Sequence, residues 1–256
     1  MPPKRAPAKQ SRRAHRGPPD GARLNDRADH RYYPVEMPNH TDILSLPQPG
    51  VADLWRIPLD GSARAQLSIL SPEECARHRR LRGARRDQFA LAHGAMRRIV
   101  ARYMSCPPKA LALSADAGHA PSVKGVRLSL SHCPDLALLA VSAGVVGVDV
   151  EQLAVAQDED LADVADLTLS PRERTAFQRM SEAQRPRAWL RSWTRREAVV
   201  KARPGVLSES AISELDVSES PVLDLTLQDL DVGPAHVAAL ATSSPTPIVV
   251  LREWDA

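Results

Sequence analysis

Hydrophobic and polar residues follow two kinds of pattern along this chain, and each predicts a different secondary structure. Apolar and β-branched residues in short alternating runs indicate strands. We expect strands at 51–60, 126–132, 136–141, 145–151, about 223–227, 236–241 and 248–253. Apolar residues at helical spacing predict helices over 87–104 and about 187–202. This mixture predicts an α+β fold.

Two further helices are marked by their first residues. Ser71-Pro72-Glu73-Glu74 and Ser170-Pro171-Arg172-Glu173 share one design, with Ser as the N-cap, Pro at the first helical position and Glu at the third. This arrangement is typical of a capping box, in which the Ser and Glu side chains bind the free backbone N–H groups of the first turn. We therefore expect helices to begin at Pro72 and Pro171.

Parts of the chain repeat about one hundred residues apart. Leu70-Ser71-Pro72 returns as Leu169-Ser170-Pro171, and the apolar pattern of 134–142 returns at 234–242. Chance is the alternative for matches this short. Their similar offsets favour two similar α/β halves related by a pseudo-twofold axis, which meet near residue 145 and leave a ligand cleft between them.

The strand expected at the junction carries two acids. In Val145-Val146-Gly147-Val148-Asp149-Val150-Glu151, a period of two places Asp149 and Glu151 on one face and the valines on the other. Neighbouring carboxylates repel each other, so this face favours a bound cation, and Mg²⁺ takes oxygen ligands of this kind. The alternative is the exposed face of an edge strand.

A third acid lies in the helix expected at 187–202. Trp189, Trp193 and Val200 fall on one arc of this helix, and Glu197 lies inside that apolar stripe. An acid there is costly unless it is paired or bound to a metal ion. Lys201 lies one turn later, so a simple Glu197–Lys201 surface pair is the alternative. We expect Arg97, Arg98 and Arg102 to form a solvated helix face.

Composition restricts the class of protein. Hydrophobic residues make up 43% of the chain, as in a soluble globular protein. Its three cysteines, Cys75, Cys106 and Cys133, lack the spacing of a metal site, which favours reduced thiols. The sequence contains neither an apolar run long enough for a membrane span nor a signal peptide, so we expect a cytoplasmic protein.

Charge is distributed unevenly along the chain. Residues 1–31 hold nine Lys or Arg and three Asp, whereas the rest of the chain is slightly acidic. A basic segment with Pro, Gly and few apolar residues cannot form its own core. A nucleic-acid-binding arm is the alternative, although no aromatic residues accompany it as stacking platforms. The expected organisation is a disordered basic Pro-rich tail over 1–45, an N-terminal α/β half over 46–147 and a C-terminal α/β half over 148–256.

Two spaced motifs resemble those of a known family. Gly147-Val148-Asp149-Val150-Glu151, followed 42 residues later by Trp193-Thr194-Arg195-Arg196-Glu197-Ala198-Val199-Val200-Lys201, resembles the paired signature of the 4′-phosphopantetheinyl transferase superfamily. Ser129-Leu130-Ser131-His132 and Ser71-Pro72-Glu73 extend the resemblance to about residues 50–243. The chain is most similar to the large, pseudo-dimeric type, represented by the surfactin-synthetase-activating enzyme. That type contains its symmetric interface within one chain, which favours a monomer.

The resemblance implies an enzyme that moves the 4′-phosphopantetheine arm of coenzyme A onto a serine of an apo acyl, peptidyl or polyketide carrier protein and releases 3′,5′-ADP. Asp149, Glu151 and Glu197 would hold Mg²⁺. Glu197 would also act as the base, and Lys201 would bind the pyrophosphate. The remaining coenzyme A contacts implied by the family are Arg77, Arg80, His119, Ser131 and His132. The region after Glu151, up to about Ser170, would contact the carrier protein.

The chain departs from the family pattern at three places. Ser129 stands where Asn is usual, Arg196 where Lys is usual, and His119 where a Gly-Lys-Pro loop has its lysine. None of the implied metal ligands is lost, so we expect an active enzyme. A catalytically inactive coenzyme A-binding relative and a nucleic-acid-binding protein that acts through its basic tail remain the alternatives.

Overall fold

The computed structural model of the chain describes residues 43–113, 122–123, 125–156, 161–206 and 209–255. These residues all belong to one compact unit. Nearly all of the predicted tail lies outside the described residues, and so does His119. No helix within the described ranges combines the length and the apolar composition needed to cross a bilayer.

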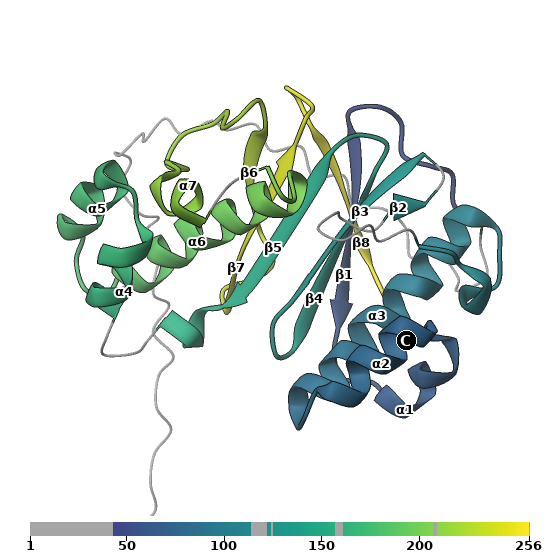
Figure 1. Ribbon diagram of the computed structural model, residues 1–256. Helices are drawn as coiled ribbons and strands as arrows, with labels where there is room; N and C mark the ends of the chain where they lie inside the picture. The colour runs from purple at the N-terminus through teal and green to yellow at the C-terminus, as the bar shows by residue number, and fades with distance from the viewer. Residues whose placement is uncertain (1–42, 114–121, 124, 157–160, 207–208, 256) are drawn as a thin grey trace, which may run out of the picture. The chain divides into compact units, whose positions relative to one another are not determined.

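Two β-sheets form the centre of this unit (Figure 1). One sheet has the strand order β2-β3-β4-β1-β8, and the other has the order β5-β7-β6. The strands are β1 (Val51–Pro58), β2 (Ser122–Val123), β3 (Val126–His132), β4 (Leu136–Ser142), β5 (Val146–Gln152), β6 (Thr226–Leu230), β7 (His236–Thr242) and β8 (Ile248–Glu253). Neighbouring strands are antiparallel except β1 and β8, which are parallel. The last strand of the chain therefore returns to the sheet of the first.

Helices cover the outer faces of the two sheets (Figure 1). Beside the five-stranded sheet lie α1 (Ala63–Gln66), α2 (Pro72–Arg80) and α3 (Ala84–Met104). Beside the three-stranded sheet lie α4 (Leu161–Thr168), α5 (Pro171–Gln178), α6 (Arg185–Ala202) and α7 (Glu209–Glu214). Short 3₁₀ turns occur at Leu67–Ile69, Pro108–Ala110 and Leu153–Ala156.

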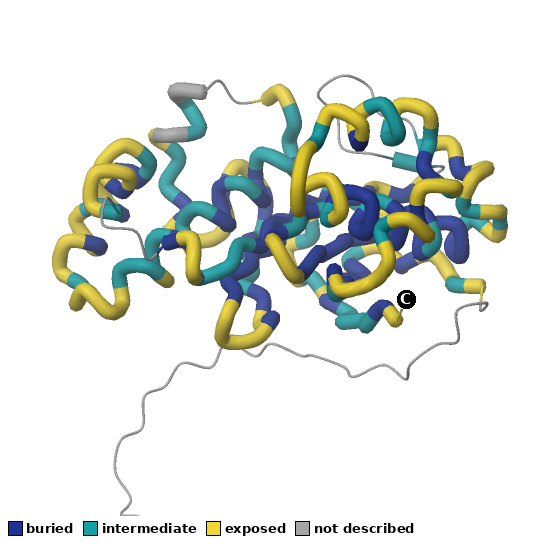
Figure 2. The backbone as a smooth tube through the Cα atoms, turned by 90° about the horizontal axis from the view of Figure 1, so that it is seen from below, coloured by how far each residue is buried: buried dark blue, intermediate teal, exposed yellow. Residues whose placement is uncertain are grey.

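The inner faces of the two sheets pack against each other. Val148 and Val150 of β5 are fully buried in one apolar cluster with Leu54 of β1 and Leu138 of β4. Each such side chain contributes about 1.5–3 kcal/mol when it leaves water. Buried positions accordingly concentrate in the central strands, while the outer helical turns are exposed (Figure 2). The valine face of β5 thus points to the other sheet, and its acidic face points to α6.

Both predicted capping boxes are confirmed. Ser71 Oγ accepts a hydrogen bond from the backbone of Glu74 at 3.2 Å, and Glu74 Oε2 accepts one from the backbone of Ser71 at 2.8 Å. Ser170 and Glu173 exchange the same two bonds at 3.3 and 2.9 Å. Helices α2 and α5 therefore begin where the sequence predicts.

The strand expected at about 223–227 was misplaced, because β6 spans Thr226–Leu230. Leu223 and Asp224 have φ angles of 48° and 62°, which belong to a turn rather than to a strand. Helices α4 and α7 were not expected at all. Both are short, with eight and six residues, and short helices give a weak periodic signal.

The expectation of a solvated arginine face on α3 is wrong for two of its three residues. Arg97 is only 2% exposed, forms an ion pair of 3.2 Å with Glu74, and donates to the carbonyl of Leu111 at 2.7 Å. The guanidinium of Arg102, also buried, lies 5.6 Å from the ring centre of Trp55. These partners are distant in sequence, so local hydropathy could not reveal them.

The mixed α and β content and the two sheets agree with the predicted α+β class. The similarity of the two halves and their division between residues 147 and 148 remain predictions. One observation limits a simple division: β8 comes from the later half of the chain but pairs with β1.

Arg97 and Arg98 provide a matched pair for testing the buried ion pair. Arg97→Ala removes the fully buried partner of Glu74 and leaves that carboxylate with His93, at 3.1 Å, and the backbone of Ser71, so we expect the free energy of unfolding to fall by about 3 kcal/mol. Arg98 is half-buried and donates to Gln66 at 3.2 Å, so Arg98→Ala should cost about 1 kcal/mol or less. Urea unfolding of both variants measures the difference. Equal losses would contradict a special role for Arg97.

Candidate active site

Gly147 allows α6 to lie directly against β5. A Cβ atom at this position would lie 2.0 Å from the carbonyl oxygen of Ala198 and 2.6 Å from the backbone nitrogen of Ala202. Any larger residue would therefore overlap the backbone of α6. Because side chains alternate along a strand, Asp149 and Glu151 share the face of Gly147 and are turned toward α6.

Asp149 lies at the centre of a small buried network. Its side chain is 4% exposed, and Lys201 Nζ donates to its Oδ1 atom at 2.6 Å. Ser131, at the end of β3, donates to the same oxygen at 2.7 Å and accepts from Lys201 at 2.9 Å. The network joins a strand of each sheet to α6. The second carboxylate oxygen of Asp149, Oδ2, is buried without a hydrogen-bond partner among the described residues.

Glu151 and Glu197 complete an acidic cluster around this network. Burial, followed by the charge of Asp149, raises the pKa of Glu151 to about 7; Glu197 also raises this pKa, while Lys201 and a hydrogen bond from Trp193 lower it. Burial and the charge of Asp149 likewise raise the pKa of Glu197, against Lys201 and Arg196. Three carboxylates surround one lysine, so the cluster has a net negative charge when all three carboxylates are ionised.

Helix α6 is oriented differently from the sequence expectation. Trp189, Trp193 and Val200 are only half-buried, and the two indole rings stack with their centres 5.8 Å apart. The side of α6 that enters the core includes Leu190, Thr194, Ala198 and Val199. Glu197 and Lys201 lie at the edge of that buried face. Lys201 pairs with Asp149, so it does not act simply as the surface partner of Glu197.

Groups suited to an anion gather at the end of β3. Burial lowers the pKa of His132, and so do the charges of His93, Lys201 and Arg77. Arg77 lies with its guanidinium 5.3 Å from the ring centre of Phe89, which stacks on His93 at 3.9 Å. His93 was missed from the sequence, because a single histidine in a helix carries no distinguishing signal.

Two residues that were predicted to bind coenzyme A are not seen at this site in the described part of the chain. Arg80 is exposed, and its Nε donates to the carbonyl of Ala76 at 3.4 Å within its own helix. His119 lies outside the described residues. Both remain predictions.

Ser129 and Arg196, where the chain departs from the family pattern, hold the elements that carry the site. Ser129 Oγ accepts a hydrogen bond from the backbone of Val148 at 2.9 Å and so ties β3 to β5. Arg196 is 2% exposed and forms an ion pair of 2.7 Å with Glu173 of α5. It also donates to the carbonyl of Leu215 at 3.0 Å. These contacts position strands and helices rather than a substrate.

Comparisons with known proteins agree with this geometry. The family model described as the 4′-phosphopantetheinyl transferase superfamily matches residues 145–244, which include β5, α6 and β7. The chain is also 29% identical over 187 residues to the 4′-phosphopantetheinyl transferase HetI of Nostoc sp. strain PCC 7120, covering 68% of this chain and 77% of that protein. Residues 145–244 thus match the 4′-phosphopantetheinyl transferase superfamily that the sequence motifs predict. The predicted family and enzyme class, a 4′-phosphopantetheinyl transferase, are confirmed.

The match places the acidic cluster and Lys201 inside the region shared with this superfamily. Ser131, His132 and Arg77 precede residue 145 and lie outside this matched segment, so their roles as coenzyme A ligands remain predictions.

Gly147 offers a direct test of the contact between β5 and α6. Gly147→Ala should force the backbone of α6 away from the strand and lower the free energy of unfolding by about 1–3 kcal/mol or more. Gly144→Ala is the matched control, because its Cβ would meet only the hydroxyl of Ser243, at 3.2 Å. Thermal and urea unfolding of both variants give the comparison. Equal stability of the two variants would contradict the close contact.

Proposed function

We propose that this transferase carries out Mg²⁺-dependent transfer of the 4′-phosphopantetheine arm of coenzyme A to a serine of an apo acyl, peptidyl or polyketide carrier protein. The phosphorus–oxygen bond to the leaving group breaks as the serine oxygen bonds to phosphorus, and 3′,5′-ADP is released. The superfamily establishes the transfer. The observation that supports the metal requirement is the buried, unpartnered oxygen of Asp149 in a cluster whose other carboxylates, Glu151 and Glu197, feel the charge of Asp149.

The donor set fits Mg²⁺. Asp149 Oδ2 has no hydrogen-bond partner among the described residues, and an unsatisfied buried carboxylate oxygen is costly. Glu151 and Glu197 are half-buried beside it. Mg²⁺ is held by one or two carboxylates together with water and substrate phosphates, and a set of oxygen donors alone suits it. When bound, the ion supplies positive charge that polarises a phosphoryl oxygen.

Lys201 is suited to bind the pyrophosphate. Its ammonium group is held by Asp149 Oδ1 and Ser131 Oγ, so its position is fixed before a substrate arrives. Cations in fixed positions stabilise the charge that develops during phosphoryl transfer. Ser131 therefore positions Lys201 and Asp149 relative to each other.

Glu197 is the best candidate for the general base. It is half-buried on α6, and burial and the charge of Asp149 raise its pKa from the ordinary glutamate value. A base with a pKa nearer to neutral accepts a proton more readily in the transition state. Glu197 would take the proton of the attacking serine hydroxyl, directly or through one water molecule.

His132 and Arg77 would bind the 3′-phosphate of coenzyme A. Their charges act on each other, and Lys201 acts on His132 from the side of the pyrophosphate site. The 3′-phosphate of coenzyme A could thus be bound by Arg77 and His132 while its pyrophosphate is bound by Lys201 of α6. Ser131, Arg80 and His119 remain the further predicted contacts with coenzyme A.

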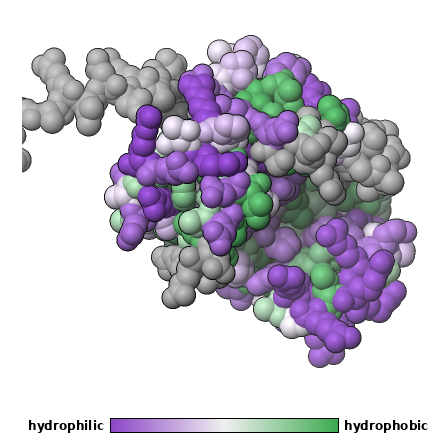
Figure 3. All heavy atoms as spheres, turned by 60° about the vertical axis from the view of Figure 1, so that its left-hand side comes forward, coloured by the Kyte–Doolittle hydropathy of each residue, from purple (hydrophilic) through white to green (hydrophobic). Residues whose placement is uncertain are grey.

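A carrier protein would dock near α4. Val155, Val164 and Leu167 are exposed apolar side chains in the region after Glu151, and Leu167 is 79% exposed. Figure 3 brings this side of the molecule forward and shows hydrophobic areas between hydrophilic ones. A monomeric state and a cytoplasmic location, both expected from the sequence, remain predictions.

The two alternative functions receive less support. A coenzyme A-binding relative without catalysis would not need an intact set of Asp149, Glu151, Glu197 and Lys201. The basic tail that would bind nucleic acid lies outside the described residues.

Replacement of Asp149 tests the proposed centre. Asp149→Asn keeps the shape of the side chain but removes its charge, so we expect kcat for 3′,5′-ADP release to fall by about 10²–10³-fold, as on loss of one transition-state contact. Asp224→Asn is the matched control, since the side chain of Asp224 is 75% exposed, pairs with Arg203 at 2.8 Å and lies outside both the acidic cluster and α4. Near-normal kcat in Asp149→Asn, with coenzyme A and a carrier protein at saturation, would contradict the proposal.

A further inference from the structure

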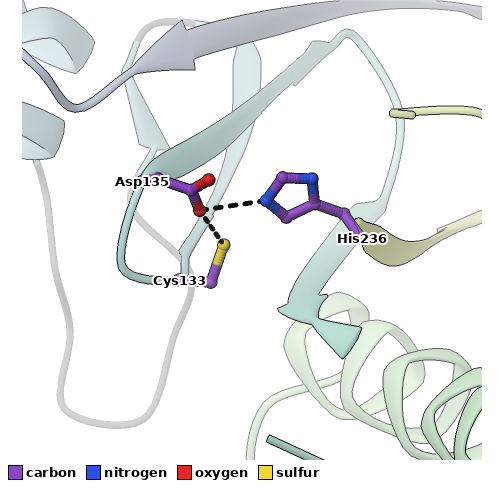
Figure 4. A group of neighbouring side chains, drawn as sticks. All are labelled: Cys133, Asp135 and His236. Atoms are coloured by element: carbon purple, nitrogen blue, oxygen red, sulfur yellow. Dashed lines mark hydrogen bonds and ion pairs between the residues drawn. The ribbon is translucent and has the colours of Figure 1, made fainter. Parts of the chain in front are cut away.

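A second group of possible metal ligands lies outside the active site. Cys133 follows β3, Asp135 precedes β4, and His236 begins β7. Figure 4 shows the three side chains pointing toward one another from these two parts of the chain. Asp135 Oδ1 lies 2.9 Å from His236 Nε2 and 3.5 Å from Cys133 Sγ. All three candidate ligand atoms lie within 4.8 Å of one another.

The distances suit a small tetrahedral ion. Zinc bonds of about 2.0–2.3 Å place neighbouring ligand atoms about 3.3–3.8 Å apart in a tetrahedral site. Small side-chain rotations would bring the observed separations into this range. Cys133 and His236 are buried, whereas the side chain of Asp135 is 54% exposed, which leaves a path from solvent.

A metal ion would bind Cys133 as the thiolate. Burial raises the pKa of the Cys133 thiol to about 11, but hydrogen bonds from the backbone of Asp135 and Leu136 lower it. A backbone bond of 2.9 Å from Cys133 N to Leu136 O holds this turn closed. Backbone donors around the sulfur would stabilise its negative charge once the proton is displaced.

We propose that Cys133, Asp135 and His236 form a binding site for a divalent transition-metal ion, with Zn²⁺ the best match. A thiolate, an imidazole and a carboxylate together select such an ion over Mg²⁺, which prefers oxygen donors. Three protein ligands leave the fourth position to water.

The metal would tie the β3–β4 turn of one sheet to β7 of the other. The same metal-mediated link would restrict the position of His132, which precedes Cys133. The proposal rests on the geometry of this cluster and is independent of the transferase reaction, so metal binding alone tests it.

Metal titration of the full chain provides the test. The protein is stripped with a chelator, transferred to buffer with excess Mg²⁺, and titrated with Zn²⁺ against a chromophoric chelator. We expect one Zn²⁺ per chain. Cys133→Ser and His236→Gln should weaken binding by at least about 100-fold, since even loss of an outer-shell partner costs about 10–100-fold. Cys75→Ser is the matched control and should bind as the unmodified chain does.

Cobalt and heat distinguish a ligand from a structural cysteine. Bound Co²⁺ should give a thiolate-to-metal absorption band in the unmodified chain and in Cys75→Ser but not in Cys133→Ser. Zn²⁺ should raise the midpoint of thermal unfolding of the unmodified chain and of Cys75→Ser, but not that of Cys133→Ser. Circular dichroism checks that each variant is folded. If Cys133→Ser does not fold, the test uses His236→Gln instead. Unchanged Zn²⁺ affinity in a folded Cys133→Ser or His236→Gln variant, or no stoichiometric binding by the unmodified chain, would overturn the proposal.

Discussion

The direct contact between the backbone of α6 and Gly147 of β5 determines the arrangement of the active site. It turns Asp149 toward α6 and removes its carboxylate from water, which costs several kcal/mol for an unpaired ion. Lys201 offsets part of this cost by binding one oxygen, and the other oxygen remains for a cation. Glu197 approaches from the same helix. One close contact therefore brings together acids from two elements that are far apart in sequence.

Polar contacts between the neighbouring elements stabilise the position of α6 against β5. Ser129 links β3 to β5, and the buried pair of Arg196 and Glu173 links α6 to α5. Removing one member of such a pair leaves an uncompensated buried charge, so the helix depends on both residues. The residues where this chain departs from the family pattern thus act on the scaffold. Within the described residues, Ser129 and Arg196 form hydrogen bonds with Val148, Glu173 and Leu215, so their variation acts on the acidic cluster indirectly. The charge of Arg196 also lowers the pKa of Glu197.

Local patterns predicted most strands, both capped helices and the acidic face of β5, because strand alternation and helix caps depend on residues close in sequence. Pairing between distant residues was not predictable in this way. Arg97 and Arg196 are buried because Glu74 and Glu173 meet them, whereas hydropathy placed Arg97 at the surface. The stacked Trp189 and Trp193 are half-buried although they are apolar. Cys133 showed no metal spacing because its neighbour His236 comes from another strand.

Metal-dependent transfer to a carrier protein is the central claim, and the mass of the carrier tests it most directly. The protein is incubated with an apo acyl carrier protein and coenzyme A, with either Mg²⁺ or a chelator, and the intact carrier is weighed. The account predicts a mass gain of one phosphopantetheine arm with Mg²⁺ and none with the chelator. An equal gain in both samples would contradict the role of the acidic cluster. No gain with several types of carrier, while coenzyme A still binds, would contradict an active transferase.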